Sequence, residues 1–167
     1  MAHGKVYIPP LIGNMGLFSK KKKNIPLNAH MSTAQRAVSL WAKEMNVPCK
    51  DDGDHLCLTI DDWKINCFFD LTEDYVEVSI VSTLTYDKDS ISPGNEWLVY
   101  QDLLKEISEY LHHPFAMDRD ENGEIRLYFM NVLTFDDIAP LSKIQDEIID
   151  TYLDVKNLSE AIDKLFG

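Results

Sequence analysis

The segment 55-HLCLTIDDWKINCFFD-70 decides the fold, because two alternating apolar runs flank a pair of aspartates at Asp61 and Asp62. A two-residue loop at these aspartates predicts a β-hairpin with a fixed register. The expected cross-strand pairs are Ile60 with Trp63, Leu58 with Ile65, and Leu56 with Cys67. All of these side chains share one face with Phe69, so the hairpin presents a continuous apolar stripe to the core.

Elements on either side of the hairpin extend it into a larger unit. Residues 74–84 alternate in the same way, and their short link to the hairpin favours a three-stranded antiparallel meander. On the other side, residues 33–46 carry apolar side chains at helical spacing and end ahead of Pro48. Ser32 and Gln35 fit a capping box, which places the expected start of this helix between them.

The second half of the chain predicts a helix followed by two strands. An apolar face runs from Trp97 to Leu111, and the helix that carries it should end before Pro114. Strands are expected at about 115–118 and 124–133, joined by a short polar loop.

A final helical region closes the chain. It is expected to begin near Asp136, and its apolar pattern continues to Phe166, either as one helix or with a break near Asn157. The complete order, α-β-β-β-α-β-β-α, predicts an α+β fold in which helices pack on an antiparallel sheet.

Charge is distributed unevenly along the chain, which has 167 residues and a formal net charge of -12. Residues 1–30 contain five lysines and no Asp or Glu, so the remainder carries 11 basic and 28 acidic residues, or -17. An acidic body argues against a nucleic-acid-binding groove, because phosphate contacts need a basic surface. The charge suits solubility or a basic partner.

Residues 1–30 are expected to form a basic tail without regular structure, and residues 31–167 a single domain. Met15 is a candidate alternative translation start. The lysine run of the tail consists of Lys20, Lys21, Lys22 and Lys23. It offers at most weak contact with an anionic surface. No stretch is apolar for long enough to form a transmembrane helix, and three cysteines without CxxC spacing predict reduced thiols in the cytoplasm.

One acidic segment resembles a calcium-binding loop in part. Residues 118–123 copy the first half of an EF-hand loop, but position 12 of that loop is Phe129, where calcium needs a carboxylate. The flanking segments also have strand patterns rather than helical ones. A polar hairpin in which Asn122 and Gly123 supply positive φ is therefore favoured.

Two adjacent histidines are the other candidate for metal or acid–base chemistry. His112 and His113 follow a predicted helix, where neighbouring side chains point about 100° apart, so they do not form a joint metal site by themselves. Capping of the last helical carbonyls is the simpler interpretation. The sequence contains no Gly-rich phosphate loop and nominates no nucleophile–base pair. We therefore expect no catalytic residue, no cofactor and no metal, and predict that the chain is not an enzyme.

The strand predicted at 124–133 is apolar on both faces, which is typical either of a central strand or of a strand at an interface. Ile125, Leu127 and Phe129 form one face. The candidate partner-binding residues are Tyr128, Met130 and Val132 of the other face, together with Trp97.

The element order over residues 32–167, the acidic composition and the ending Leu165-Phe166-Gly167 resemble the type III secretion chaperone-like fold. They are similar in particular to its YbjN-type branch of bacterial proteins. The resemblance implies a cytoplasmic, non-enzymatic protein that binds other polypeptides and often forms a homodimer. We therefore expect a chaperone-like protein or regulatory adaptor. The alternative is an acidic inhibitor or immunity protein that neutralises a basic partner by charge complementarity.

Overall fold

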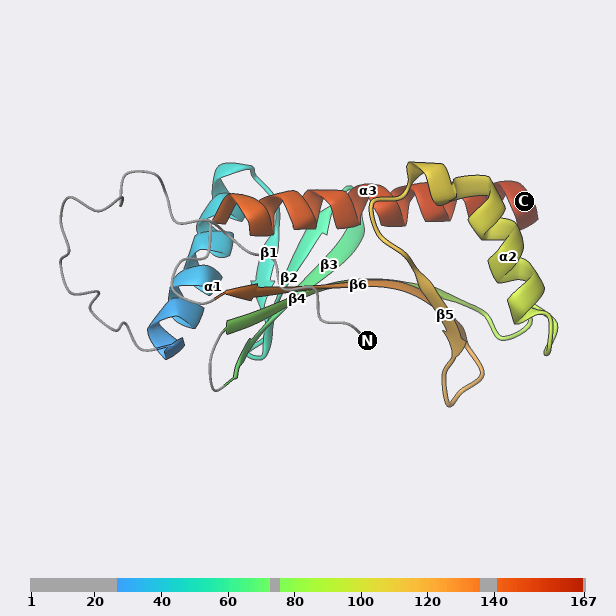
Figure 1. Ribbon diagram of the computed structural model, residues 1–167, viewed down its shortest axis with the longest axis horizontal. Coiled ribbons are helices and arrows are strands. Elements are labelled where there is room, and N and C mark those ends of the chain that lie inside the picture. The colour runs from blue at the N-terminus through green and yellow to red at the C-terminus, as the bar shows by residue number, and fades with distance from the viewer. Residues whose placement is uncertain (1–26, 73–75, 136–140, 167) are drawn as a thin grey trace.

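The computed structural model describes residues 27–72, 76–135 and 141–166. The elements in chain order are helix α1 (Leu27–Glu44), strands β1 (Cys49–Asp51), β2 (His55–Ile60), β3 (Trp63–Leu71) and β4 (Val76–Tyr86), helix α2 (Glu96–Ile107), the 3₁₀ turn η2 (Ser108–Tyr110), strands β5 (Ala116–Arg119) and β6 (Ile125–Phe135), and helix α3 (Leu141–Phe166). The strands form one antiparallel sheet in the order β1-β2-β3-β4-β6-β5 (Figure 1). The α+β class predicted from the sequence is confirmed.

The hairpin at the centre of the prediction has the expected register. Ile60 pairs with Trp63, Leu58 with Ile65, and Leu56 with Cys67. Asp61 and Asp62 have φ angles of 47° and 71°, which is the backbone of a type I′ turn, whose twist matches that of the flanking strands. The stripe from Leu56 to Phe69 is buried as predicted, except that Ile60 and Trp63, next to the turn, are half-buried.

The beginning of the fold differs from the prediction in two respects. Strand β1 was not expected, because its three residues are exposed and too short to show a period; it pairs with β2 and precedes the hairpin. Helix α1 begins at Leu27, inside the segment expected to be a tail. Met31 packs against the core and Ala34 and Val38 are buried, so the apolar face of the helix continues through the capping-box residues. Residues 1–26, with Met15 and the lysine run, lie outside the described residues.

The helices pack on one face of the sheet. Side chains from α1, α2 and α3 form a single buried cluster with the inward-facing side chains of β2, β3, β4 and β6. Helix α3 contacts β3, β4 and β6 and lies along the sheet, with α1 and α2 beside its two ends (Figure 1). It is one continuous helix of 26 residues, without a break at Asn157. The start expected near Asp136 lies outside the described residues.

Candidate functional site

The outward face of β6 carries three of the four residues predicted to bind a partner. Ile125, Leu127 and Phe129 face the helices and are buried, so the alternating residues Tyr128, Met130 and Val132 point to the opposite face. On β4, Val81 lies opposite Met130, and on β3 Phe68 is one strand further away. We call Phe68, Val81, Tyr128, Met130 and Val132 the open-face strip. None of them belongs to the core cluster, and Met130 is 45% exposed.

Charged residues flank the strip at both ends. Asp70 and Glu77 are cross-strand neighbours on the same face at the end near the β3–β4 connection. At the other end, Arg126 donates two hydrogen bonds to the carboxylate of Asp118, at 2.9 and 2.8 Å. The Arg126–Asp118 pair is neutral overall, whereas neither Asp70 nor Glu77 has an ion pair with a described residue.

Strand β6 is longer than its neighbour β5, which leaves part of its edge open. Strand β5 pairs with residues 125–128 of β6, whereas β4 pairs with all of residues 125–135. Within the described ranges, no strand pairs with residues 129–135 on the side away from β4. We call this stretch the free edge. An unpaired strand edge presents backbone N–H and C=O groups that can pair with another chain.

Trp97 lies apart from the strip. It is on α2, a helix that packs against α3 and β5, and its side chain is 64% exposed. Its ring stacks on Tyr100, with ring centroids 5.8 Å apart, and the Tyr100 hydroxyl donates to the Phe115 carbonyl. The structure therefore brings Tyr128, Met130 and Val132 together and places Trp97 on another element. Its role as a partner anchor stays a prediction.

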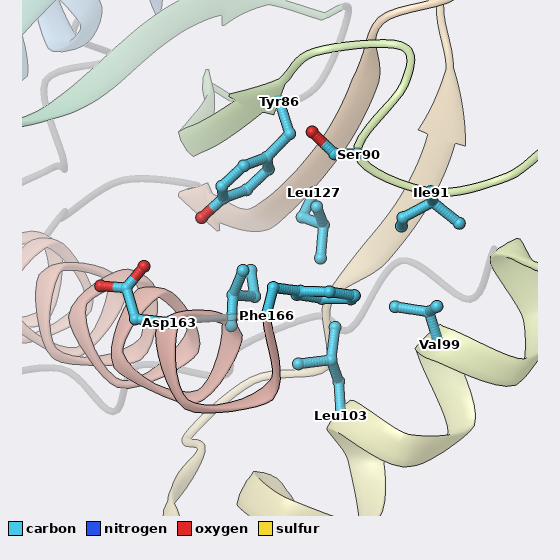
Figure 2. A pocket seen from close by; sticks show the side chains of 9 residues that line it. Tyr86, Ser90, Ile91, Val99, Leu103, Leu127, Asp163 and Phe166 are labelled. Carbon is cyan, nitrogen blue, oxygen red and sulfur yellow. The ribbon is translucent and has the colours of Figure 1, made fainter.

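A pocket opens on the helix side of the sheet, where α2, the end of α3 and the β4–α2 loop meet (Figure 2). Its volume is about 360 Å³. The lining residues are Tyr86, Ser90, Ile91, Val99, Leu103, Leu127, Ile162, Asp163 and Phe166. The pocket could not be predicted from sequence, because its residues come from elements that are distant along the chain, and its apolar residues each fit an ordinary core pattern.

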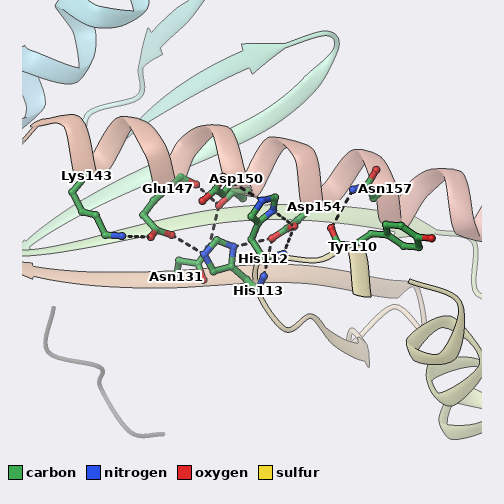
Figure 3. Close-up of polar contacts among 10 residues, drawn as sticks. Tyr110, His112, His113, Asn131, Lys143, Glu147, Asp150, Asp154 and Asn157 are labelled. Carbon is green, nitrogen blue, oxygen red and sulfur yellow. Dashed lines mark hydrogen bonds and ion pairs between the residues drawn. The ribbon is translucent and has the colours of Figure 1, made fainter. Parts of the chain in front are cut away.

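The two histidines form a cluster with acidic residues of α3 (Figure 3). The carboxylate of Asp154 is fully buried and accepts from the backbone N–H and ring Nδ1 of His112, at 2.8 and 2.9 Å. It accepts in the same way from His113, at 3.0 and 2.8 Å. The Nε2 of His113 donates to Glu147 at 2.7 Å, and Lys143 pairs with Glu147 at 3.1 Å. We call His112, His113, Asp154 and Glu147 the histidine clamp.

The clamp corrects the interpretation of these histidines as caps of helical carbonyls. They lie in the segment after η2 and bind a buried carboxylate instead. Burial alone would lower the pKa of His113, but hydrogen bonds to Asp154 and Glu147 and the charge of both raise it to about 9. The ring is therefore an imidazolium near neutral pH, with both nitrogens occupied. The clamp fastens the segment before β5 to α3 and leaves His113 no free nitrogen for proton transfer.

The acidic loop that resembles an EF-hand is a hairpin turn between β5 and β6. The Asp120 carboxylate accepts from the backbone N–H groups of Asn122 and Glu124, at 2.8 and 3.0 Å, so it stabilises the turn itself. Gly123 has the positive φ, 81°, whereas Asn122 does not. Across the described part of the chain, no group of three or more His, Cys, Asp or Glu residues could hold a metal ion.

Cys49 and Cys67 have no sign of activation as nucleophiles. Burial raises the pKa of Cys49, and it raises the pKa of Cys67, in the core stripe, to about 12. A raised pKa keeps a thiol protonated and therefore poorly nucleophilic.

None of the helices in the described ranges combines the length and the apolar composition of a membrane span.

Comparison with known proteins gives likeness of fold only. No family model matches the chain, and no curated protein matches its sequence. The solved structure of an uncharacterized protein from Methanothermobacter thermautotrophicus superposes with a TM-score of 0.57 at 14% identity, over 80% of this chain and 99% of that one. YbjN from E. coli, provisionally described as a transcription regulator, gives a TM-score of 0.46 at 12% identity, over 76% of this chain and 87% of that one. A YbjN structure is thus found among the similar folds, as the element order predicted.

Proposed function

We propose that this chain is a non-enzymatic polypeptide-binding module that takes an extended segment of its partner along the free edge of β6. The observation that carries the proposal is the coincidence of two features on one strand. Within the described part of the chain, no strand pairs with residues 129–135 on one side, and the same stretch displays Met130 and Val132 on the open face. A strand added there would pair backbone groups and place alternate side chains beside the strip.

The chemistry of the remaining residues supports a binding role. His113 holds its proton between two carboxylates, and the pKa values of the Cys49 and Cys67 thiols are both raised. Such groups are poor bases and poor nucleophiles near neutral pH. A chaperone-like or regulatory adaptor role in the cytoplasm agrees with this.

A second copy of the chain is one partner that the edge would accept. Two β6 edges related by a two-fold axis would pair antiparallel and join the strips of both copies into one surface. We therefore expect light scattering at high concentration to give about twice the monomer mass of 19.2 kDa. The 19.2 kDa mass itself at every concentration would exclude a homodimer and leave a foreign polypeptide as the partner.

The alternative function, neutralisation of a basic partner by an acidic inhibitor, is supported by the charge of -17 outside residues 1–30. The two functions differ in salt dependence. Binding by strand addition and apolar contacts should survive high salt, whereas contacts between exposed charges are screened.

Affinity capture from the native host tests the proposal. The bait is the full-length chain, used at low and high salt together with two matched variants. Met130→Lys places a charge on the open-face strip, and Leu40→Lys places the same charge on α1, where the leucine is 55% exposed. We expect Met130→Lys to release the partner at both salt concentrations and Leu40→Lys to retain it. Equal capture by both variants would refute binding at this face.

Amide hydrogen exchange on the captured complex examines the edge directly. The amides that point outward from residues 129–134 should exchange readily in the free protein and become protected with the partner bound. If protection falls on α1 or α3 and leaves these residues unchanged, the partner does not add a strand to β6.

A further inference from the structure

The pocket between α2 and the end of α3 has a closed apolar floor and a partly open mouth. The buried side chains of its floor are Ile91, Leu103, Leu127 and Ile162. Tyr86 and Val99 are half-buried at the mouth, where Phe166 is 51% exposed. Figure 2 shows Phe166 between α3 and the side chains of α2, with Tyr86 entering from β4. A floor without hydrogen-bonding groups accepts a flat apolar body.

Among the described lining residues, Tyr86, Ser90 and Asp163 carry polar side-chain groups, and Asp163 on α3 is the anionic one. Asp163 is exposed at the rim and has no ion pair with any described residue. The Tyr86 hydroxyl is hydrogen-bonded to Ser159, and burial, together with the charge of Asp163, raises its pKa. Tyr86 therefore stays neutral, so the carboxylate of Asp163 is the only charged group among the described lining residues.

We propose that this pocket binds a small amphipathic amine, with its ring on the apolar floor and its protonated nitrogen facing Asp163. The volume of about 360 Å³ lies near the lower end of small-molecule sites, which suits a ligand of about 10–15 non-hydrogen atoms. The net charge of -12 favours a cation over an anion at any such site.

The pocket is independent of the proposed polypeptide site. Leu127 lines it from the helix side of β6, whereas Tyr128, one residue later, belongs to the open-face strip. Either site can therefore fail its test without affecting the other.

Three indole compounds of similar shape and different charge test the proposal on the full chain. Tryptamine is a cation, tryptophol is neutral and indole-3-acetate is an anion near neutral pH. In ¹⁵N-resolved NMR titrations, we expect millimolar tryptamine to shift the amides near Tyr86, Ile91 and Phe166. Affinity should fall from tryptamine to tryptophol to indole-3-acetate. Absence of shifts at these amides, or equal affinity for all three compounds, would overturn the proposal.

Two variants separate charge from shape. Asp163→Asn should reduce tryptamine affinity about three- to fivefold, as expected for a partly exposed ion pair, and leave tryptophol unchanged. Asp146→Asn, the same change on α3 away from the pocket, is the matched control and should alter neither affinity. Val99→Phe fills the mouth and should abolish binding of all three compounds. If Asp163→Asn and Asp146→Asn weaken tryptamine equally, the effect is one of net charge and the assigned role of Asp163 is wrong.

Discussion

The histidine clamp should make the stability of this protein depend on pH in a defined direction. His113 has a pKa of about 9 in the folded protein, against 6.5 for an ordinary histidine. Since the folded-state value is the higher one, the stabilisation is complete below pH 6.5 and is lost as the pH rises through about 9. At about 1.4 kcal/mol per pKa unit, the shift from 6.5 to about 9 corresponds to about 3 kcal/mol of unfolding free energy.

Comparison of the wild type with His113→Gln isolates this contribution. Glutamine can still donate a hydrogen bond but cannot carry the charge, so Asp154 and Glu147 lose their buried cation. Urea unfolding, followed by tryptophan fluorescence from pH 6 to pH 10, gives the free energy of both proteins. We expect a difference of about 3 kcal/mol near pH 6 that shrinks toward pH 10. Groups outside the clamp that titrate in this range affect both proteins alike and cancel in the difference.

The matched control is His55→Gln. His55 also bonds a carboxylate, that of Asp54 at 2.6 Å, but Asp54 is 78% exposed, so the pair is open to solvent. Its replacement should change stability by less than about 1 kcal/mol. If the curves of wild type and His113→Gln run parallel from pH 6 to pH 10, the clamp does not hold a stabilising imidazolium and the reasoning fails.

Three further predictions concern the fold. Phe129→Ala should cost about 3–5 kcal/mol in urea unfolding, because the ring is fully buried, whereas Met130→Ala, one residue later on the exposed face, should cost less than about 1 kcal/mol. Asp62→Gly should raise the unfolding free energy by about 1 kcal/mol, because the φ of 71° strains a residue with a Cβ; a loss measured in the same assay would mean that the turn needs the aspartate. Arg119→Lys should accelerate amide exchange in the β4–α2 loop, because the guanidinium donates to the carbonyls of Lys88 and Ile91 and to Glu96; unchanged exchange there would refute this bracing role.

The hairpin could be predicted from sequence because every determinant lies within sixteen consecutive residues. The period of two fixes which side chains face the core, and the aspartate pair fixes the register. Strand β1 could not be predicted, since three exposed residues show no period and its existence depends on the edge that β2 offers. Likewise, the start of α1 depends on packing of Met31, which outweighs the local capping preference of Ser32.

The clamp was missed because its partners are about forty residues apart in sequence. A signal existed in α3 nonetheless. Ile144, Ile148, Val155 and Leu158 define its apolar face, and the carboxylates of Glu147 and Asp154 lie within that same face. A carboxylate on the buried stripe of a helix requires a cationic or hydrogen-bonding partner from elsewhere in the chain. His112 and His113, interpreted from sequence as helix caps, are cationic candidates for that partner, so the two observations together favour the contact.

The outward apolar side chains of β6 agree with the proposed binding of another chain. The sequence left open whether this strand is central or at an interface. Among the described residues, it is central at residues 125–128 and an edge at residues 129–135. Burial in the core accounts for only one of its faces. The adjacent strand β4 faces the same open side mainly with polar residues, namely Glu77, Ser79, Thr83 and Thr85, interrupted by Val81. The outward residues of β6 begin and end with the polar Arg126 and Thr134, but Tyr128, Met130 and Val132 lie between them. Met130 and Val132, the outward apolar residues of β6 beyond its pairing with β5, lie on the free edge, which is the arrangement that the proposed strand addition requires.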